Sequence, residues 1–523
     1  MDTKALRQKI LDLAIRGKLV PQDPKDEPAA VLLERIRAEK MQMVKDGKLK
    51  PKDIKNDTII YKGDDNLHYE KFQDGSVKCI EDEIPFELLE GWAWCRLLPL
   101  TIKIGAGSTP TGGAAVYSTS GIKFIRSQNV YDDGLVLTDV AYISEEINQK
   151  KSGSIVKPKD ILLNITGGSI GRCALVPDDF DIANVNQHVI IIRLVNPELR
   201  KYLHDVITSP YIQEQILSRQ VGSGRGGLSA ETLSTFLIPL PPMNEQVSII
   251  KKLQDCISYT LTIADAQRSV SDLVSATKSK ILDLAIRGKL VPQDQNDEPA
   301  SMLLERIRSE KEELKKQGKI KRDKKESVIF KGDDNSYYQD LPENWQFTSL
   351  REITTPLTLN DGDWILSQNM SNIGEVKLLQ LGSIGNMVYI DKGFKYLTKD
   401  TFNELSCTEI FSGYLLINRI ISDKMCCCIV PNIDGTIITT VDTCWIAPSN
   451  ASYDIKFLMY QLASPTFQKE VLLKASGTTR RRISKNNLIN ISLLLPPLAE
   501  QKRIVVAIEK IFATLDDISN QVV

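Results

Sequence analysis

A fifteen-residue segment occurs twice in this chain and constrains its fold more than any other feature. The letters KILDLAIRGKLVPQD stand at 9–23 and again, unchanged, at 280–294. The segment LLERIR follows each copy, at 32–37 and 303–308, and keeps the same displacement of 271 positions. Two unrelated helices would rarely share an identity of this length, so we interpret the chain as an internal repeat.

A second pair of matches has a displacement of 255 positions. The motif LPPxxEQ occupies 240–246 and 495–501. The two displacements together indicate a circular repeat. Residues 500–523 match the first part of the segment 245–287, and residues 1–16 match its last part. We therefore expect the two chain ends to lie close together, inside one copy of the repeated helix.

The segment 245–287 has the pattern of one long helix, which Asn244 would cap and Gly288 would end. Apolar residues recur every three or four positions along it and along 500–523, a spacing typical of coiled coils. In the C-terminal segment the stripe is Ile504, Ile508, Ile511, Leu515, Ile518 and Val522. A two-fold relation between the copies makes the helices antiparallel, and each is about 65 Å long.

Two larger segments, 84–243 and 341–498, lie between the helical parts. Each mixes short β-type runs with one helical stretch near its end, at 197–218 and at 453–474. The expected fold class is therefore α+β. We expect two globular domains, separated by two long antiparallel coiled-coil helices, in a pseudo-two-fold circular repeat.

The remaining segments complete this division of the chain. Residues 1–83 are an N-terminal repeat region, 244–340 a central repeat region, and 499–523 a C-terminal repeat helix. In the first two regions we expect a short LLERIR helix and then a loosely ordered linker, at about 38–83 and 309–340, because these stretches are rich in Lys, Asp and Gly.

Composition and charge exclude several classes of protein. Of 523 residues, 42% are hydrophobic and 25% charged, values typical of a globular chain. The net charge of −1 removes the simplest argument for nucleic-acid binding, a strongly basic surface. The sequence has no apolar stretch of about 18 residues and no signal-peptide block. Nine cysteines, with the run Cys426–Cys428, lack metal-ligand spacing, so we expect no metal site and a cytoplasmic location.

This organisation resembles the specificity subunits of type I restriction–modification enzymes. The resemblance spans nearly the whole chain. It rests on the duplicated fifteen residues, on Trp92 and Trp345 at the domain starts, on the two LPPxxEQ motifs and on the circular order. The resemblance implies that 84–243 and 341–498 are target recognition domains, each reading one half of a split, asymmetric DNA sequence, with the repeat helices as a spacer.

The same resemblance implies the partners of the chain. These are double-stranded DNA, two modification subunits and motor–nuclease restriction subunits, with no membrane. The modification subunits would bind the repeat regions and methylate adenine with S-adenosylmethionine, and the motor–nuclease subunits would use ATP and Mg. This chain would itself bind none of these cofactors.

The motifs support a non-catalytic role. Amino-methyltransferases carry [DNS]-P-P-[YFW], but the proline pairs here follow leucine and precede Met243 or Leu498. Gly17-Lys18 and Gly288-Lys289 lack the remainder of a phosphate-binding loop, and the glycine-rich run 105–113 favours a flexible loop. An intrinsic methyltransferase or nuclease is therefore excluded on motifs. The alternative that stays open is a coiled-coil protein–protein scaffold without DNA specificity, which the near-neutral charge favours.

Direct base reading requires bidentate groups such as Arg, Asn and Gln. Three polar sets recur in both variable domains. The first is Arg126, Ser127, Gln128 and Asn129, which we match with Ser367, Gln368 and Asn369. The second is Asn164 and Thr166, matched with Asn418 and Arg419. The third is Asn186, Gln187 and His188, matched with Asp442 and Thr443. For each set the alternative is ordinary turn chemistry or packing.

A basic loop precedes each LPPxxEQ motif. The segment 222–229 matches 477–484, and small residues flank arginine in both. The arginines are Arg225 in the first copy and Arg480, Arg481 and Arg482 in the second. We predict a mobile phosphate clamp, because mobile arginines contact phosphates without reading sequence. The alternative is a solvated charged loop.

Overall fold

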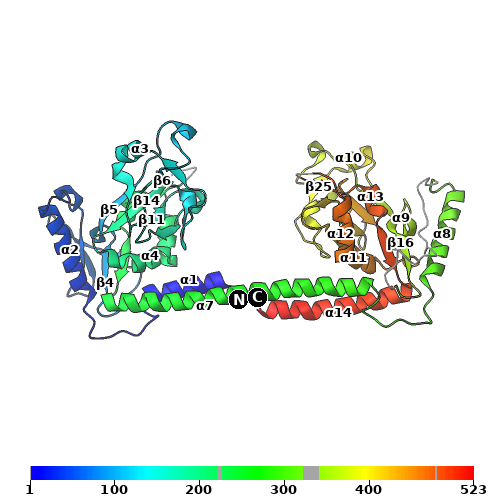
Figure 1. Ribbon diagram of the computed structural model, residues 1–523, viewed down its shortest axis with the longest axis horizontal. Helices are drawn as coiled ribbons and strands as arrows, with labels where there is room; N and C mark the ends of the chain where they lie inside the picture. The colour runs from blue at the N-terminus through cyan, green and yellow to red at the C-terminus, as the bar shows by residue number, and fades with distance from the viewer. Residues whose placement is uncertain (1, 221–225, 322–340, 478–479, 523) are drawn as a thin grey trace. The chain divides into compact units, whose positions relative to one another are not determined.

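The computed structural model of the chain describes residues 2–220, 226–321, 341–477 and 480–522. The chain divides into two compact units, Met1–Ala266 (unit 1) and Gln267–Val523 (unit 2). The boundary falls inside the long helix α7 (Met243–Ile286), so each unit contains one part of that helix (Figure 1). The two units are described separately.

Unit 1 is built around two four-stranded sheets. One has the order β12-β11-β14-β5 and is antiparallel throughout. Its strands are β5 (Thr101–Ala106), β11 (Ile161–Asn164), β12 (Cys173–Leu175) and β14 (Val189–Leu194). The other has the order β10-β13-β6-β9, in which β13 and β6 are parallel. Its strands are β6 (Ile122–Ile125), β9 (Ala141–Ile143), β10 (Ile155–Val156) and β13 (Ala183–Val185).

The apolar run of β14 explains how these sheets are layered. All four residues Val189–Ile192 are fully buried. Ile190 and Ile192 join the core cluster under helix α4 (Arg200–Thr208), whereas Val189 and Ile191 join the cluster between the sheets. Because successive side chains of a strand point to opposite faces, an unbroken apolar run is the signature of a strand that is covered on both sides.

Unit 2 repeats the plan with shorter strands. One sheet has the order β17-β24-β20-β22 and the other β19-β18-β23, with β18 and β23 parallel. The first comprises β17 (Leu359–Asp361), β20 (Leu415–Asn418), β22 (Cys427–Ile429) and β24 (Thr443–Ile446). The second comprises β18 (Val376–Leu379), β19 (Lys395–Leu397) and β23 (Ile437–Thr439). Helices and strands are thus mixed in both units, as expected.

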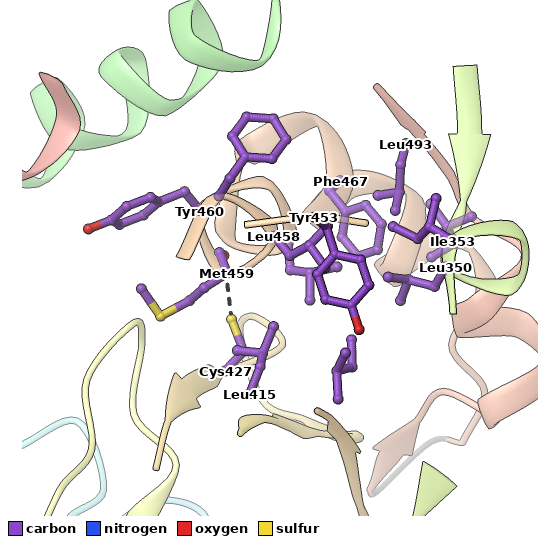
Figure 2. Packing of buried hydrophobic residues seen from close by; sticks show 14 of the residues in the cluster. Leu350, Ile353, Leu415, Cys427, Tyr453, Leu458, Met459, Tyr460, Phe467 and Leu493 are labelled. Carbon is purple, nitrogen blue, oxygen red and sulfur yellow. Dashed lines mark hydrogen bonds between the residues drawn. The ribbon is translucent and has the colours of Figure 1, made fainter. Parts of the chain in front are cut away.

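The core of unit 2 contains the cysteines that the sequence displays as a run. Figure 2 shows Cys427 beside Leu415 and facing helix α11 (Ile455–Ala463), where its thiol donates to the carbonyl of Met459 over 3.7 Å. Burial raises the pKa of the Cys428 thiol to about 12. These cysteines are therefore core side chains. Among the described residues, His, Cys, Asp and Glu do not gather in any group of three that could hold a metal ion.

The expected single helical stretch near the end of each domain is in fact two helices. In unit 1 the break separates α4 from α5 (Pro210–Ser218), and in unit 2 it separates α11 from α12 (Pro465–Lys474). Proline has no amide hydrogen, and it forces the residue before it out of the helical region. Ser209 is accordingly extended, with ψ of 153°. The prediction of one helix was wrong at this point.

The loosely ordered linker expected at 38–83 was also wrong. Helix α2 (Ala29–Lys45) extends well beyond the LLERIR letters, and a three-stranded antiparallel sheet follows it. The strands are β1 (Ile59–Lys62), β2 (His68–Lys71) and β3 (Val77–Cys79). The polar residues that indicated a linker form the hairpin turns, where Asn66 and Gly75 have φ of 65° and 86°. In unit 2, α8 (Ala300–Lys316) is the matching helix, and residues 322–340 of its expected linker lie outside the described residues.

Buried charge pairs attach this small sheet to unit 1. Arg96, on β4 (Ala93–Arg96), contacts both oxygens of Glu70 at 3.1 and 2.7 Å and Glu83 at 2.7 Å. Lys40 of α2 contacts Asp57 at 2.8 Å. Breaking a buried pair leaves an uncompensated charge, which is strongly destabilising. The sheet is therefore an ordered part of the unit.

The duplicated sequence motifs meet in space within each unit. In unit 1 the indole N–H of Trp92 donates to Glu245 over 2.9 Å, and Gln22 donates to the same carboxylate over 3.4 Å. Gln22 comes from the fifteen-residue segment, Trp92 from the domain start and Glu245 from LPPxxEQ. These two contacts, which join three residues, explain why widely separated letters are repeated together.

Unit 2 contains the same arrangement. Trp345 donates to Glu500 over 3.0 Å and Gln293 donates to it over 2.7 Å. Burial raises the pKa of both glutamates, against the lowering effect of these hydrogen bonds. Each glutamate lies in the first turn of a long helix, so this cluster joins the domain start to that helix.

The long helices have nearly the expected bounds. Helix α7 begins at Met243, so Asn244 is not its cap; this residue lies in the first turn and donates to Asp26 over 2.8 Å. In unit 1, α1 (Thr3–Ile15) lies along the first part of α7, and in unit 2, α14 (Leu498–Val522) runs along the last part (Figure 1). Among the described residues, none of these helices has the length and apolar character needed to cross a membrane.

Candidate nucleic-acid interface

In unit 1 the polar sets converge on one edge of the two sheets. The loop after β11 contacts the loop after β6, because the Asn164 amide donates to the carbonyl of Ser127 over 2.7 Å. It also contacts the loop between β13 and β14, where Thr166 Oγ1 lies 2.6 Å from His188 Nδ1. Three segments far apart in the sequence therefore form one surface, which the strand order brings together.

Burial divides the predicted residues of unit 1 into two groups. Asn129, Asn164 and Asn186 are buried. Asn129 donates to the carbonyl of Val136 over 3.0 Å, and Asn186 accepts the backbone N–H of His188 over 3.0 Å. A buried amide that holds its own loop presents no edge to a base in this conformation, so these residues position the interface.

Gln128 and Gln187 are the exposed members of the predicted sets in the described part of unit 1. Gln128 donates to the carboxylate of Asp139 over 3.0 Å, and half-buried Arg126 donates to the carbonyl of Asp139 over 3.0 Å. Gln187 contacts the ring of His188 at 3.1 Å. These exposed bonds are weak enough to be exchanged for bonds to a ligand.

The basic loop of unit 1 approaches the same edge. Arg225 lies outside the described residues. Immediately after it, Gly227 pairs with Thr166 and the N–H of Leu228 donates to the carbonyl of Ile165 over 2.9 Å. The loop therefore returns to the sheet beside the predicted polar residues.

Unit 2 builds its corresponding edge with charged side chains. Arg482 lies 3.0 Å and Arg480 3.5 Å from the carboxylate of Asp442. The backbones of Arg481 and Arg482 form β25 and pair with β21 (Ile420–Ile421). The predicted arginine loop is thus attached to the sheet at one side, and Arg480 and Arg481 remain exposed.

Arg419 is the charged centre beneath this surface. It is buried, donates to the carbonyl of Val441, and lies 3.3 Å from the carboxylate of Asp361. Burial raises the pKa of Asp361, whereas the charge of Arg419 opposes that shift. Asn418 accepts the N–H of Ile420 over 2.9 Å. Arg419 and Asn418 therefore shape the loop from inside.

The match between the two SQN segments was wrong. In unit 1, Ser127–Asn129 follows β6, whereas Ser367–Asn369 precedes β18, the strand that takes the place of β6. The segment that follows β18 is Leu381–Ser383. Three shared letters are too short a match to define correspondence, and the pairing of parallel strands decides it. Ser367 still faces the same side of unit 2, where it lines a cleft with Arg480.

The match for the third set was displaced by two residues. The N–H of Ile165 donates to the carbonyl of His188, and the N–H of Arg419 donates to the carbonyl of Asp442. Asp442 therefore corresponds to His188, not to Asn186. Thr443 is a buried residue of β24 and does not belong to the loop.

The structure explains why one position of the glycine-rich run in unit 1 is glycine. A Cβ on Gly107 would lie 1.8 Å from the carbonyl oxygen of Val185, and one on Gly362 of unit 2 would lie 2.3 Å from Thr439 Oγ1. Both loops therefore pass directly against the end of a parallel strand, where only glycine fits. The expectation of a flexible loop did not include this close approach at Gly107.

Comparison with known proteins now adds to this geometry. The sequence model of the family described as "Type I restriction modification DNA specificity domain" matches residues 102–269 and 342–522. Each match covers one of the two interface edges. This chain belongs to that family. The sequence-based interpretation as a specificity subunit is therefore confirmed, and the chain is a recognition subunit and not by itself an enzyme.

Curated specificity subunits are similar over most of the chain. The EcoEI specificity subunit of Escherichia coli is 26% identical over 99% of this chain and 90% of its own length. The EcoAI specificity subunit of E. coli is 29% identical over 79% of this chain and 71% of its own length. A chain solved in work on assembly and conformational transition of the type I R-M system superposes with a TM-score of 0.52 at 18% identity, covering 84% of this chain and 94% of that chain. This likeness concerns the fold.

Some residues of this specificity subunit's interface escaped the sequence reasoning. Asp139 holds Arg126 and Gln128, and Asp361 pairs with Arg419. Gln380 precedes Leu381–Ser383 and was hidden by the incorrect SQN match. A buried arginine requires a partner, but Asp361 lies 58 positions before Arg419 in the chain, so its place in the sequence gave no indication of this pairing. No sequence signal pointed to Asp139.

Proposed function

We propose that each unit of this specificity subunit reads one half of a split, asymmetric DNA sequence. The observation that carries the proposal is that the two edges share a backbone arrangement and differ in side chains. Ile165 and His188 are joined by the same backbone hydrogen bond as Arg419 and Asp442, at 3.0 and 2.9 Å. A shared backbone arrangement that carries different polar side chains suits the reading of two different base sequences.

We also propose how phosphate contacts divide from base contacts. Arg480 and Arg481 have exposed side chains, and the backbone of Arg481 is fixed by the pairing of β25 with β21. Both side chains therefore suit contacts to phosphate oxygens. Exposed Gln128, Gln187 and Gln368 carry amides that suit base edges. The buried asparagines support these groups from below.

In this proposal the repeat helices are the spacer between the half-sites. The eleven seam positions of α7 that the 3.5-residue period selects, from Ile249 to Leu284, are all buried or half-buried, as the seam of a coiled coil requires. Within unit 2, Gln267 donates to the carbonyl of Val522 over 2.7 Å. We propose an antiparallel coiled coil in a circular repeat, in which the N-terminal helix continues the C-terminal one and the chain ends adjoin.

We propose that the repeat regions bind two modification subunits, and that motor–nuclease subunits join this complex. S-adenosylmethionine, ATP and Mg would belong to those partners, which act on DNA in the cytoplasm. The net charge of −1 supports a need for partners, because phosphate binding requires positive charge that this chain does not have in excess. We expect the chain alone to bind DNA weakly.

The test is to co-express the full chain with its modification subunit and to map methylated adenines across the genome. We expect one split sequence with a constant gap, and no methylation when either protein is absent. A complex that assembles but methylates without a defined sequence would contradict the proposal and favour the scaffold alternative.

A further inference from the structure

Trp364 differs from every other tryptophan of the chain. All five lie in described parts, and Trp92, Trp94, Trp345 and Trp445 are between 2% and 9% exposed. Trp364 is 71% exposed. The largest apolar side chain loses the most by facing water, and a lone exposed tryptophan beside a polar surface often contacts a ligand. Its placement therefore calls for a binding partner.

The backbone that carries Trp364 is held firmly. Gly362, two residues earlier, passes against the end of β23, where a Cβ would lie 2.4 Å from the carbonyl oxygen of Thr440. The N–H of Asp363 donates to the carbonyl of Thr439 over 2.8 Å, and the carbonyl of Asp363 accepts the N–H of Val441 over 2.8 Å. Trp364 is thus presented on an ordered frame, which lowers the entropy cost of binding.

Trp364 borders a cleft of about 610 Å³ on unit 2. Polar and charged groups share its walls with apolar ones: Leu366, Gln380, Lys395, Thr440 and Arg480. Within the described residues the side-chain amide of Gln380 makes no hydrogen bond, although the residue is half-buried. Arg480 stands at the rim with its side chain 65% exposed, 3.5 Å from the carboxylate of Asp442, which also lines the cleft. Two cations, Lys395 and Arg480, against one carboxylate leave the cleft with a net positive charge, and together with an amide that has no partner among the described residues this suits a polyanion that carries hydrogen-bonding edges.

The corresponding place in unit 1 is different. Thr109 stands two residues after Gly107, as Trp364 stands two residues after Gly362, and its hydroxyl is bonded to Gln187. Unit 1 therefore has a small polar side chain, already engaged, where unit 2 has an open aromatic one. Gly107 and Gly362 serve the same structural purpose in the two units. We therefore attribute the difference between Thr109 and Trp364 to what each unit binds.

We propose that this cleft selects an A·T base pair within the half-site read by unit 2, in the major groove. Gln380 presents its amide to adenine, which accepts at N7 and donates from N6. Trp364 makes an apolar contact with the methyl group of the paired thymine. Arg480 contacts a neighbouring phosphate. This inference rests on the proposed function and names the residues that give unit 2 its specificity.

The first experiment compares methylation patterns. Full-length wild type, Trp364→Ala and Gln380→Ala are each co-expressed with the modification subunit, and methylated adenines are mapped. We expect both variants to relax one A·T position in one half-site by about ten- to hundredfold, leaving the other half-site and the gap unchanged. Leu473→Ala is the matched control, because Leu473 is 70% exposed on α12 of the same unit and does not line the cleft.

The second experiment tests the methyl contact directly. The assembled complex is titrated with a duplex carrying the sequence that the wild type methylates, and with the same duplex in which uracil replaces thymine at the relaxed position. Removing the methyl group should weaken binding by the wild type and by Leu473→Ala, but leave Trp364→Ala unaffected. A merely structural role for Trp364 would not produce this loss of sensitivity.

Two outcomes would overturn the inference. Trp364→Ala would do so by methylating the same sequence with the same sensitivity to uracil. Weaker binding of the modification subunit by Trp364→Ala, with the methylated sequence unchanged, would show instead that Trp364 contacts protein. Both outcomes differ from failure of the proposed function, in which the wild-type complex itself would show no defined sequence.

Discussion

The backbone of Arg481 is fixed, and its side chain lies in solvent. Its backbone pairs with Ile421, while the side chain is exposed. If it contacts one phosphate, Arg481→Ala should weaken binding of the assembled complex to all sequences alike and lower the salt slope by about one. Binding measured over a series of salt concentrations checks this. Lys469→Ala, which removes an exposed cation from α12, should leave the slope unchanged. A loss confined to one base pair would make Arg481 a base reader.

Glu500 holds two donors at the junction of domain and helix. Glu500→Ala should lower the free energy of unfolding by about 1–3 kcal/mol, because the buried indole N–H of Trp345 loses its acceptor, as does the amide of Gln293 in a part-buried bond. Glu500→Gln keeps an acceptor and should cost much less. Urea unfolding of the three proteins measures the difference. Equal losses for both substitutions would show that the carboxylate charge, and not the hydrogen bonds, stabilises the junction.

The same residue predicts a pH dependence. Burial raises the pKa of Glu500 in the folded protein, so folding takes up a proton between the unfolded pKa and the folded one. The contribution of Glu500 to stability is therefore largest at low pH. It falls as pH rises from the unfolded pKa, at about 4.3, through the higher folded pKa. Glu500→Gln should remove this part of the slope, whereas Glu470→Gln, at a carboxylate of α12 whose side chain is 46% exposed, should not. Unfolding midpoints across this pH range provide the measurement.

Helix α7 is the element that would set the distance between half-sites. Seven residues inserted after Ala266 keep the seam in register and add about 10 Å of length. At about 3.4 Å per base pair, the unread gap should widen by up to about three pairs. Methylation mapping should then show both half-sites unchanged and a longer gap. An active variant with the original gap would mean that something other than these helices determines the spacing.

At the scale of the whole molecule, the two units should exchange independently. Replacing 59–243 with the equivalent part of a relative should change one half-site and leave the other unchanged, because each unit has its own core. Mapped methylation checks this outcome. A change in both half-sites would contradict independent reading.

The small sheet of unit 1 determines where that exchange should begin. An exchange that starts at residue 84 separates Arg96 from Glu70 and Glu83, which contact it at 2.7 Å or more. Such a chimera should have the same specificity but lose about 3–5 kcal/mol where the new domain lacks this arginine. Comparing the urea unfolding of the two chimeras tests the point.

Sequence patterns predicted the elements whose signals are local or repeated. The strand at Ile161–Leu163 and the helix ending near Gly288 follow from apolar period and from a terminating glycine. They did not predict β1–β3, because short hairpins rich in charge have the composition of a linker. The charge of Glu70 on β2 is satisfied by Arg96, which lies elsewhere in the chain.

The candidate interface was predictable only in part, and the reason is again physical. That Asn164 ends a strand is visible in sequence, but its contact with Ser127, in the segment that follows β6 of the other sheet, is not. Trp364 looks in sequence like any tryptophan of a core. Its exposure follows from the loop that Gly362 holds against β23.

The sequence by itself determined the repeat, the long helices and the family, because duplicated letters and a 3.5-residue period are properties of the chain alone. Only the tertiary structure decided which polar residues face outward and which positions of the two units correspond. Those depend on strand pairings between distant segments, such as β6 with β13 and β18 with β23. Accessibility is a property of the packed fold, since each side chain is covered by residues that lie far from it in sequence.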